Sequence, residues 1–203
     1  YYTGPQSKKD KTNHHHYIKT PAVMQGVNLC SAASMEMLLY HYQVNKSQYQ
    51  IATEMCEKGF NPSDACVYEN KELKGIYYTD SYQIAAYLNQ SFPQLPGRFE
   101  TVNEKGAVEV TIVEDSIRLL KQSLLNNHPV IVRTCYTNHF PCTVHLRLVT
   151  GFDDRAKLVY INEPALKLTA MAMSYDLFFN KLWIVAEQPS GSKRSTRFMV
   201  YQK

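Results

Sequence analysis

The stretch QGVNLCSAASMEMLLYHY, residues 25–42, joins a polar loop to a strongly helical pattern, with Cys30 at the junction. After this cysteine the apolar residues Ala33, Met37 and Leu38 recur at helical spacing. A helix N-terminus stabilises a thiolate through its unpaired N–H groups and its dipole. Cys30 is therefore a candidate nucleophile, and the alternatives are a small buried hydrophobe or one half of a disulfide.

The other four cysteines form two close pairs along the chain. Cys56 and Cys66 flank a loop with Gly, Asn-Pro and Ser-Asp turn signals, and Cys135 and Cys142 flank a second turn-rich segment. This spacing favours two local disulfides and leaves Cys30 unpaired, whereas the alternative is five free thiols in a reducing cytosol. Because such disulfides belong to oxidising compartments, we expect a secreted or periplasmic protein.

The composition is that of an ordinary globular protein, with 44% hydrophobic and 20% charged residues in 203 positions. The net charge of +4 is small and the basic residues are scattered, so we expect no nucleic-acid partner. No apolar run approaches the roughly 18 residues that a membrane span needs, and no signal peptide is visible. We also expect no metal and no cofactor, because His14–His16 are adjacent and diverge, and no zinc-like spacing is present.

Helical and strand patterns separate along the chain. Helical patterns begin at Cys30, at Ser47 with the capping-box sequence SQYQ, and near Asp80; two more cover 114–127 and 175–183. Segments typical of strands lie at 107–113, 129–135, 143–154, 157–164 and 195–202.

This segregation predicts an α+β fold. We expect an irregular N-terminal arm over residues 1–20 and a single domain over residues 21–203. Within that domain, a helical lobe covers about 21–100 and an antiparallel sheet lobe covers about 101–203.

A thiolate nucleophile needs a base, and His145 is the best placed of the seven histidines. It begins HLRLVTGFDD, a predicted strand that enters a hairpin turn. The ring of such a histidine also needs an orienting carboxylate or amide, and the next strand ends with Asn162 and Glu163. A hairpin symmetric about Asp154 places Glu163 opposite His145 and turns Asn162 to the other face.

Together these motifs resemble those of papain-like cysteine peptidases. Gln25, the segment LCSAASMEMLLYHY and the segment HLRLVTGFDDRAKLVYINEPA follow the family's order and intervals. The resemblance is strongest to the bacterial branch that contains the bacteriocin-processing peptidase domains of export transporters. It implies a papain-like fold opened by the cysteine-bearing helix, and a cysteine peptidase acting on a protein or peptide.

The resemblance also implies a role for each site residue. Cys30 would attack the substrate carbonyl, Gln25 would donate to the oxyanion, and His145 would be the base. The family's Asp position falls on Glu163, while Asn162 is the alternative third member, as in papain. The sequence departs from the family pattern beside the cysteine, at Leu29 and Ser31, and before the histidine, at Val144.

Two other classes of function compete with a peptidase. A papain-like binding module would keep the fold without catalysis, and a redox or metal-binding protein would use the thiols and the adjacent histidines. Amidases, transglutaminases and deamidases share the acyl-transfer apparatus, so the motifs predict acyl transfer without naming the acceptor.

Overall fold

The computed structural model describes residues 15–77, 79–101, 113–138, 141–183, 185–186, 196–197 and 199–202. His14 and the strand predicted over 107–113 lie outside these residues, except that Val113 begins a helix.

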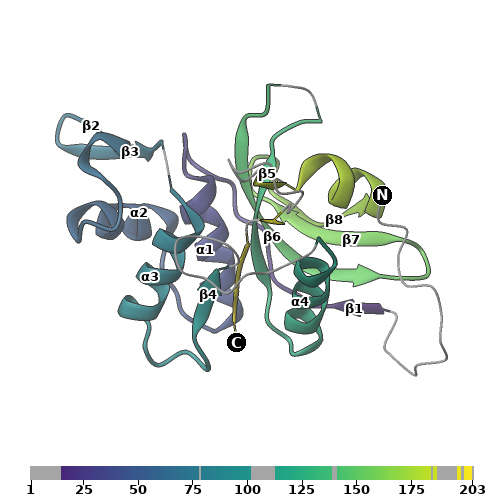
Figure 1. The fold of residues 1–203 in the computed structure, drawn as a ribbon. Coiled ribbons are helices and arrows are strands. Elements are labelled where there is room, and N and C mark those ends of the chain that lie inside the picture. Colours follow the sequence, from purple (N-terminus) through teal and green to yellow (C-terminus); the bar gives the residue numbers. More distant parts are fainter. Residues whose placement is uncertain are drawn as a thin grey trace.

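The first part of the chain forms a helical lobe (Figure 1). Its elements are α1 (Cys30–His41), α2 (Gln48–Glu57), η1 (Ser63–Ala65), β2 (Cys66–Glu69), β3 (Glu72–Ile76) and α3 (Ser81–Ser91). The β2–β3 hairpin projects from the lobe beside α2. The predicted capping box of Ser47 and Gln50 is present at the start of α2. Helix α1 is buried along most of its length, so it is the central helix of the lobe.

The second part of the chain carries an antiparallel sheet in the strand order β4-β11-β5-β6-β7-β8. The strands are β4 (Phe99–Thr101), β5 (Val130–Cys135), β6 (Val144–Asp153), β7 (Leu158–Glu163), β8 (Leu168–Ser174) and β11 (Met199–Gln202). This part of the chain also contains two helices, α4 (Val113–Leu125) and the π-helical η2 (Asp176–Leu182), and a small pair of strands, β9 (Val185–Ala186) and β10 (Thr196–Arg197). The observed fold is α+β, as predicted.

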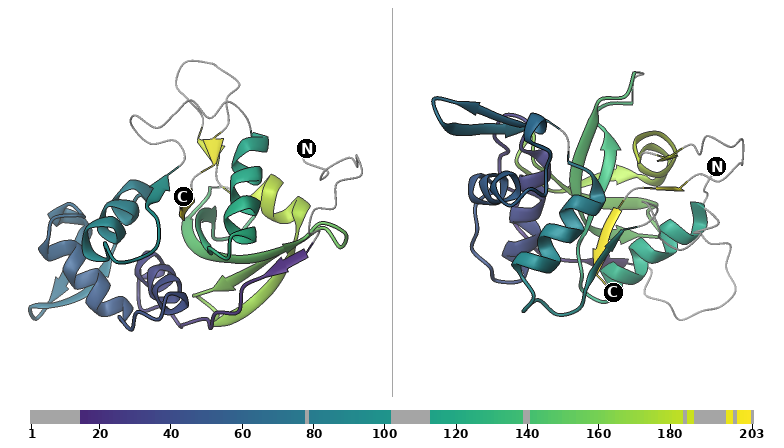
Figure 2. Two further views of the ribbon diagram at one scale, coloured as in Figure 1. Left: turned by 90° about the horizontal axis from the view of Figure 1, so that it is seen from below. Right: turned by 60° about the vertical axis from the view of Figure 1, so that its left-hand side comes forward.

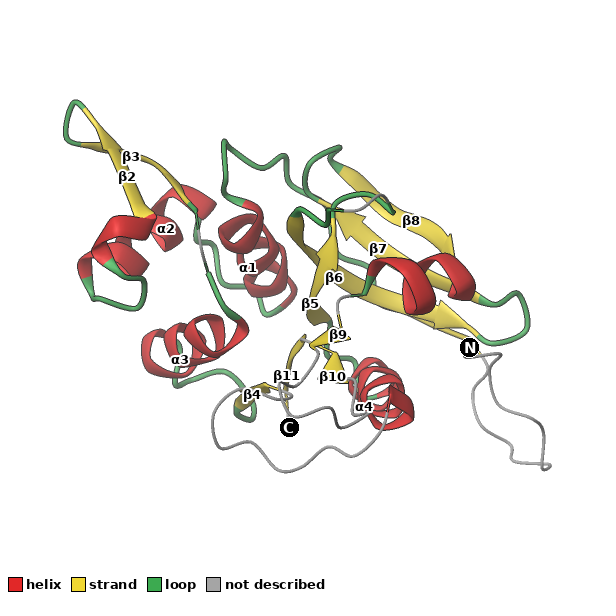
Figure 3. Cartoon of the chain, turned by 45° about the horizontal axis from the view of Figure 1, so that its top comes forward, coloured by secondary structure: helices red, strands yellow, loops and turns green. Residues whose placement is uncertain are grey.

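Helices cover both faces of the sheet, as Figures 2 and 3 show. Side chains alternate across the strands: Ile131 and Leu148 join the core of the helical lobe, whereas Val132 and Val149 join a second core under α4 and η2. The two strands at the centre, β5 and β6, are therefore buried on both sides. None of the helices in the described ranges is long and apolar enough to cross a membrane.

Part of the predicted irregular arm, residues 1–20, is a strand, while residues 18–20 have no helix or strand. His15–Tyr17 is a strand, β1, that pairs with the end of β6, where Tyr17 lies opposite Gly151. The ladder between β5 and β6 ends at Val149, so the last residues of β6 would otherwise present an open edge. A Cβ at Gly151 would lie 2.4 Å from the carbonyl oxygen of His16, so this glycine permits the close approach of β1.

The β6–β7 hairpin is present, but its register differs from the predicted one. Leu148 pairs with Asn162, and a bulge follows between Val149 and Gly151. Continued by one residue, this pairing places Arg147, not His145, opposite Glu163. The difference arises because the loop and the bulge are not symmetric about one residue. A shift of two residues preserves the alternation of faces, so the side chain of His145 still lies on the same side as that of Glu163.

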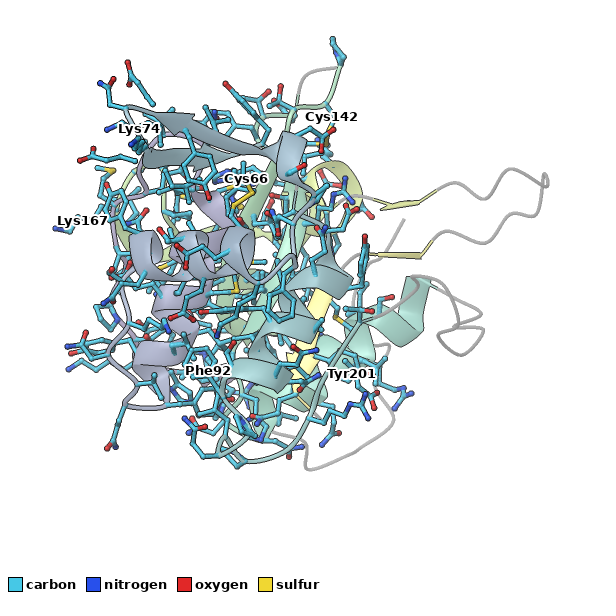
Figure 4. All side chains as sticks on the ribbon, turned by 90° about the vertical axis from the view of Figure 1, so that its left-hand side faces the viewer. Cys66, Lys74, Phe92, Cys142, Lys167 and Tyr201 are labelled. Carbon is cyan, nitrogen blue, oxygen red and sulfur yellow. A yellow bond between two sulfur atoms is a disulfide. The ribbon has the colours of Figure 1, made fainter. Side chains whose placement is uncertain are left out.

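Both predicted disulfides are present, and Cys30 is the free cysteine. Cys56–Cys66 joins the end of α2 to β2, and Cys135–Cys142 closes the loop between β5 and β6. In Figure 4 Cys66 and Cys142 lie in the same half of the molecule. In the chain-entropy model, closing loops of 10 and 7 residues stabilises a fold by about 2–3 kcal/mol each.

Candidate active site

Cys30 is the first residue of α1, at the position that the sequence predicted. The preceding residue, Leu29, is the N-cap and makes no side-chain hydrogen bond to the helix. The N–H groups of the first turn are therefore not occupied by a capping side chain. Because Cys30 is only partly buried while the following turns of α1 are buried, the helix presents its N-terminal end at the surface of the lobe.

The surroundings of Cys30 act in opposite directions on its thiol. Burial raises the pKa of Cys30, and the charge of Glu163 raises it further, while hydrogen bonds from the backbone at Leu146 and Ser31 and from its own backbone lower it. The net result is a raised pKa. The helix start alone therefore does not make Cys30 a thiolate at neutral pH, and ionisation needs a partner that takes its proton.

His145 and Glu163 form a direct pair at the sheet. The Nε2 atom of His145 lies 2.6 Å from Oε1 of Glu163, and both side chains are 3% exposed. The ring of Tyr136 packs edge-on against the imidazole, with centroids 4.9 Å apart. Since Glu163 engages Nε2, the Nδ1 atom is the ring nitrogen left to exchange a proton with another group.

Glu163 is held by three donors. Its Oε1 atom accepts from His145 and from the backbone N–H of Ala165 at 2.9 Å, and its Oε2 atom accepts from Arg147 at 2.5 Å. Burial raises the pKa of this carboxyl, but the hydrogen bond from His145, the charges of Arg147 and His145, and the Ala165 N–H together lower it to about 2. Glu163 is therefore a fixed negative charge at any physiological pH.

Arg147 is a residue of this hydrogen-bond network that the sequence analysis did not predict. It is 3% exposed, and its guanidinium donates to Glu163 and also to backbone carbonyls of the Cys135–Cys142 loop. The available signal was its place two residues after His145, which puts both side chains on one face of a strand. Without the correct register, that signal did not connect Arg147 to Glu163.

Gln25 lies in the loop before α1, close to the end of β7. Its backbone N–H donates to the carbonyl of Pro164 at 3.0 Å, next to Glu163. The buried side chain of Gln48 holds the same loop, accepting from the N–H of Gly26 at 2.7 Å and donating to the carbonyl of Met24 at 2.8 Å. The Oε1 atom of Gln25 is buried without a hydrogen-bond partner among the described residues.

Asn162 is not part of this arrangement. Its amide donates to the carbonyl of Thr20 at 2.8 Å and accepts from the N–H of Ala170 at 3.0 Å, and it is fully buried. It therefore lies on the opposite face of β7 from Glu163, as the alternation of the strand requires.

A cavity of about 440 Å³ opens beside Cys30, between the two lobes. The helical lobe contributes Ile76 and Tyr77, and the sheet lobe contributes Val144 and Leu146. At one side of it Asp80 and Arg133 form an ion pair at 3.0 Å. Within the described ranges, no group of three or more His, Cys, Asp or Glu side chains could hold a metal ion.

The Peptidase_C39 like family model matches residues 7–190. Among solved structures, a putative C39-like peptidase from Bacillus anthracis has a TM-score of 0.59 at 16% identity, covering 93% of this chain and 98% of that chain. At this identity the likeness shows a shared fold.

Two further structures have TM-scores of 0.49 at 14% identity. They are the peptidase domain of Streptococcus ComA, a bifunctional ABC transporter (91% of this chain, 100% of that chain), and xylellain, a cysteine protease from Xylella fastidiosa (100% and 90%). A search of curated proteins found no match.

Proposed function

This chain belongs to the Peptidase_C39-like family and is a cysteine peptidase, and we propose that it works through a triad of Cys30, His145 and Glu163 with Gln25 at the oxyanion. The hydrogen bond of 2.6 Å between His145 and Glu163 carries the proposal, because it engages one ring nitrogen and leaves the other for a thiol. The hydrogen bond to Cys30 from the backbone of Leu146, the residue after His145, supports the same grouping.

In the proposed reaction, His145 takes the proton of Cys30, and the thiolate attacks the carbonyl carbon of a peptide bond. The oxyanion that forms accepts hydrogen bonds from the backbone N–H of Cys30 and the side-chain amide of Gln25. His145 then donates its proton to the departing amine, and a thioester remains on Cys30. Water, deprotonated by His145, hydrolyses this thioester and restores the free thiol.

Glu163 has an orienting and electrostatic role in this proposal. As a carboxylate it stabilises the imidazolium that forms when Cys30 ionises, and its bond to Nε2 fixes the ring orientation. We also propose that the substrate is a protein or peptide, with the cavity of about 440 Å³ beside Cys30 receiving one of its side chains. The two disulfides support a proposed secreted or periplasmic location.

Native alkylation tests the proposal without a known substrate. Iodoacetamide applied to the folded protein, followed by peptide mapping, should label Cys30 rapidly, and the rate of labelling should rise with pH in a profile that depends on His145. In parallel, hydrolysis of a mixed peptide library should disappear in Cys30→Ala while the circular dichroism spectrum is unchanged. A Cys30→Ala protein that keeps full hydrolysis would falsify the proposed nucleophile.

A further inference from the structure

Arg147 joins two parts of the site that are distant in sequence. Its Nε atom donates to Oε2 of Glu163, and its Nη1 and Nη2 atoms donate to the carbonyls of Cys135 and Tyr136 at 2.8 and 3.0 Å. Nη1 also donates to the hydroxyl of Thr134. The guanidinium is thus bonded to the residue that holds the imidazole and to the loop that the Cys135–Cys142 disulfide closes.

That loop in turn contacts the imidazole. The ring of Tyr136 packs against the ring of His145 on one side, and Glu163 bonds to its Nε2 atom. Arg147 therefore contacts both residues that restrain His145, because it donates to the carboxylate of Glu163 and to the backbone carbonyl of Tyr136. A buried arginine is costly to desolvate unless its donors are satisfied, and here four donations account for that cost.

The charged groups around Glu163 give a reason for a cation at position 147. The described charged and titratable groups that face Glu163 or its partners are His145 and Arg147 on β6, Cys30 on α1 and Tyr136 after β5. In the proposed reaction His145 takes up the proton of Cys30, so without Arg147 the buried carboxylate would have no compensating positive charge before that transfer. With Arg147 present, the charges of Cys30, His145, Arg147 and Glu163 sum to zero in the proposed reaction. The sum is the same before and after the proton moves from Cys30 to His145.

We propose that Arg147 is a positioning residue of this peptidase, which balances the charge of Glu163 and fixes the disulfide-closed loop whose Tyr136 packs on His145. The inference rests on the proposed triad and adds a residue outside it. Arg147 does not touch substrate, and it acts through Glu163 and the loop.

The test measures the rate of Cys30 alkylation by iodoacetamide from pH 3 to 10 in the intact protein. In Arg147→Met the pH profile of alkylation should move to higher pH by about one unit. A cation in contact with an acid typically lowers its pKa by one to three units, and Arg147 contacts Glu163 rather than Cys30 itself. The midpoint of the rise in rate moves to higher pH because the Cys30 thiolate then faces the negative charge of Glu163 without the neighbouring positive charge of Arg147. Arg147→Lys keeps the charge but not the fork of donors, so its profile should move by less than half as much.

Lys121→Met is the matched control. Lys121 forms an ion pair with Asp154 at 2.5 Å, also largely buried, at the far end of the β6–β7 hairpin. Its loss should lower the unfolding temperature without moving the alkylation profile. If Arg147→Met lowers only the rate or the stability and leaves the profile in place, Arg147 is merely structural and the inference is wrong.

A second variant keeps the inference testable if Arg147→Met does not fold. Removing both partners of a buried ion pair is better tolerated than removing one, so Arg147→Met/Glu163→Gln should fold. If Arg147 acts through Glu163, this variant alkylates within about threefold of Glu163→Gln alone, because members of one unit are non-additive. A further loss of tenfold or more would overturn the inference that Arg147 acts by balancing the charge of Glu163. Failure of the proposed function is distinguishable, since it would leave the wild-type profile unaffected by His145→Ala.

Discussion

The two sides of the proposed site are held in different ways. On the sheet side, His145, Arg147 and Glu163 are each at most 3% exposed, and a continuous network of side-chain hydrogen bonds connects them. On the helical side, Cys30 and Gln25 are partly exposed, and backbone contacts and neighbouring residues fix them. The proposed acid–base side is thus preorganised before substrate arrives, whereas the side of the proposed nucleophile remains accessible to substrate.

This contrast indicates where substitutions affect chemistry and where they affect stability. A change on the sheet side removes a partner from a buried charged network, so it alters proton transfer and folding together. A change on the helical side leaves the core intact and affects chiefly the attack and the oxyanion.

The largest expected effect is that of His145→Ala. It removes the proposed base for Cys30, whose pKa burial raises, so alkylation of Cys30 at pH 6 should fall by about 10²- to 10⁴-fold. Library hydrolysis should fall to the level of Cys30→Ala. Stopped-flow or quenched alkylation measures the rate, and unchanged circular dichroism serves as the control. Alkylation at the wild-type rate would mean that another group ionises the thiol.

Glu163→Gln and Asn162→Ala together test which of two adjacent residues serves the triad. Glu163→Gln should reduce hydrolysis by about 10- to 100-fold, because the amide can still hold the ring but offers no charge to the imidazolium.

Asn162→Ala should leave hydrolysis within about threefold. It should destabilise the fold by about 1–3 kcal/mol, because the carbonyl of Thr20 and the N–H of Ala170 lose their buried partner. Urea unfolding and library hydrolysis measure the two effects. The opposite ranking, with Asn162→Ala the more damaging to turnover, would favour a papain-like Cys–His–Asn arrangement.

Acid unfolding should separate Glu163 from exposed carboxylates. Its folded-state pKa of about 2 lies below its ordinary value of 4.5, so its stabilising contribution is complete above that ordinary value. The contribution is lost as the pH falls from 4.5 toward 2. The wild type should therefore lose more stability across this window than Glu163→Gln, as measured by urea midpoints at several pH values. Parallel curves for the two proteins would contradict the depressed pKa.

On the helical side, a modest loss of activity is expected for Gln48→Ala. It removes two hydrogen bonds that hold the loop of Gln25, to Gly26 and Met24. Hydrolysis should fall by about three- to tenfold, corresponding to a net hydrogen-bond contribution of about 1 kcal/mol. Alkylation of Cys30 should stay unchanged, because that reaction forms no oxyanion. A parallel fall in alkylation would show that the loop also positions the thiol.

Residue type and spacing predicted those features that depend on local physics. The capping box at Ser47, the helix that begins at Cys30 and the two short disulfide loops each involve residues close in sequence, and all are present. The pairing of His145 with Glu163 was also predictable, because the two-residue period of a strand survives an even error in register.

The sequence by itself therefore determined the α+β class, the helix that carries Cys30 and the hairpin face that His145 shares with Glu163. Only the tertiary structure decided the register of that hairpin, the capture of His15–Tyr17 by the open edge of β6, and the burial of Arg147 beside Glu163. The physical reason is the sequence distance between the residues that interact. Caps, periodicity and short loops act over a few residues, whereas a sheet edge and a buried ion network exist only once distant segments have packed together.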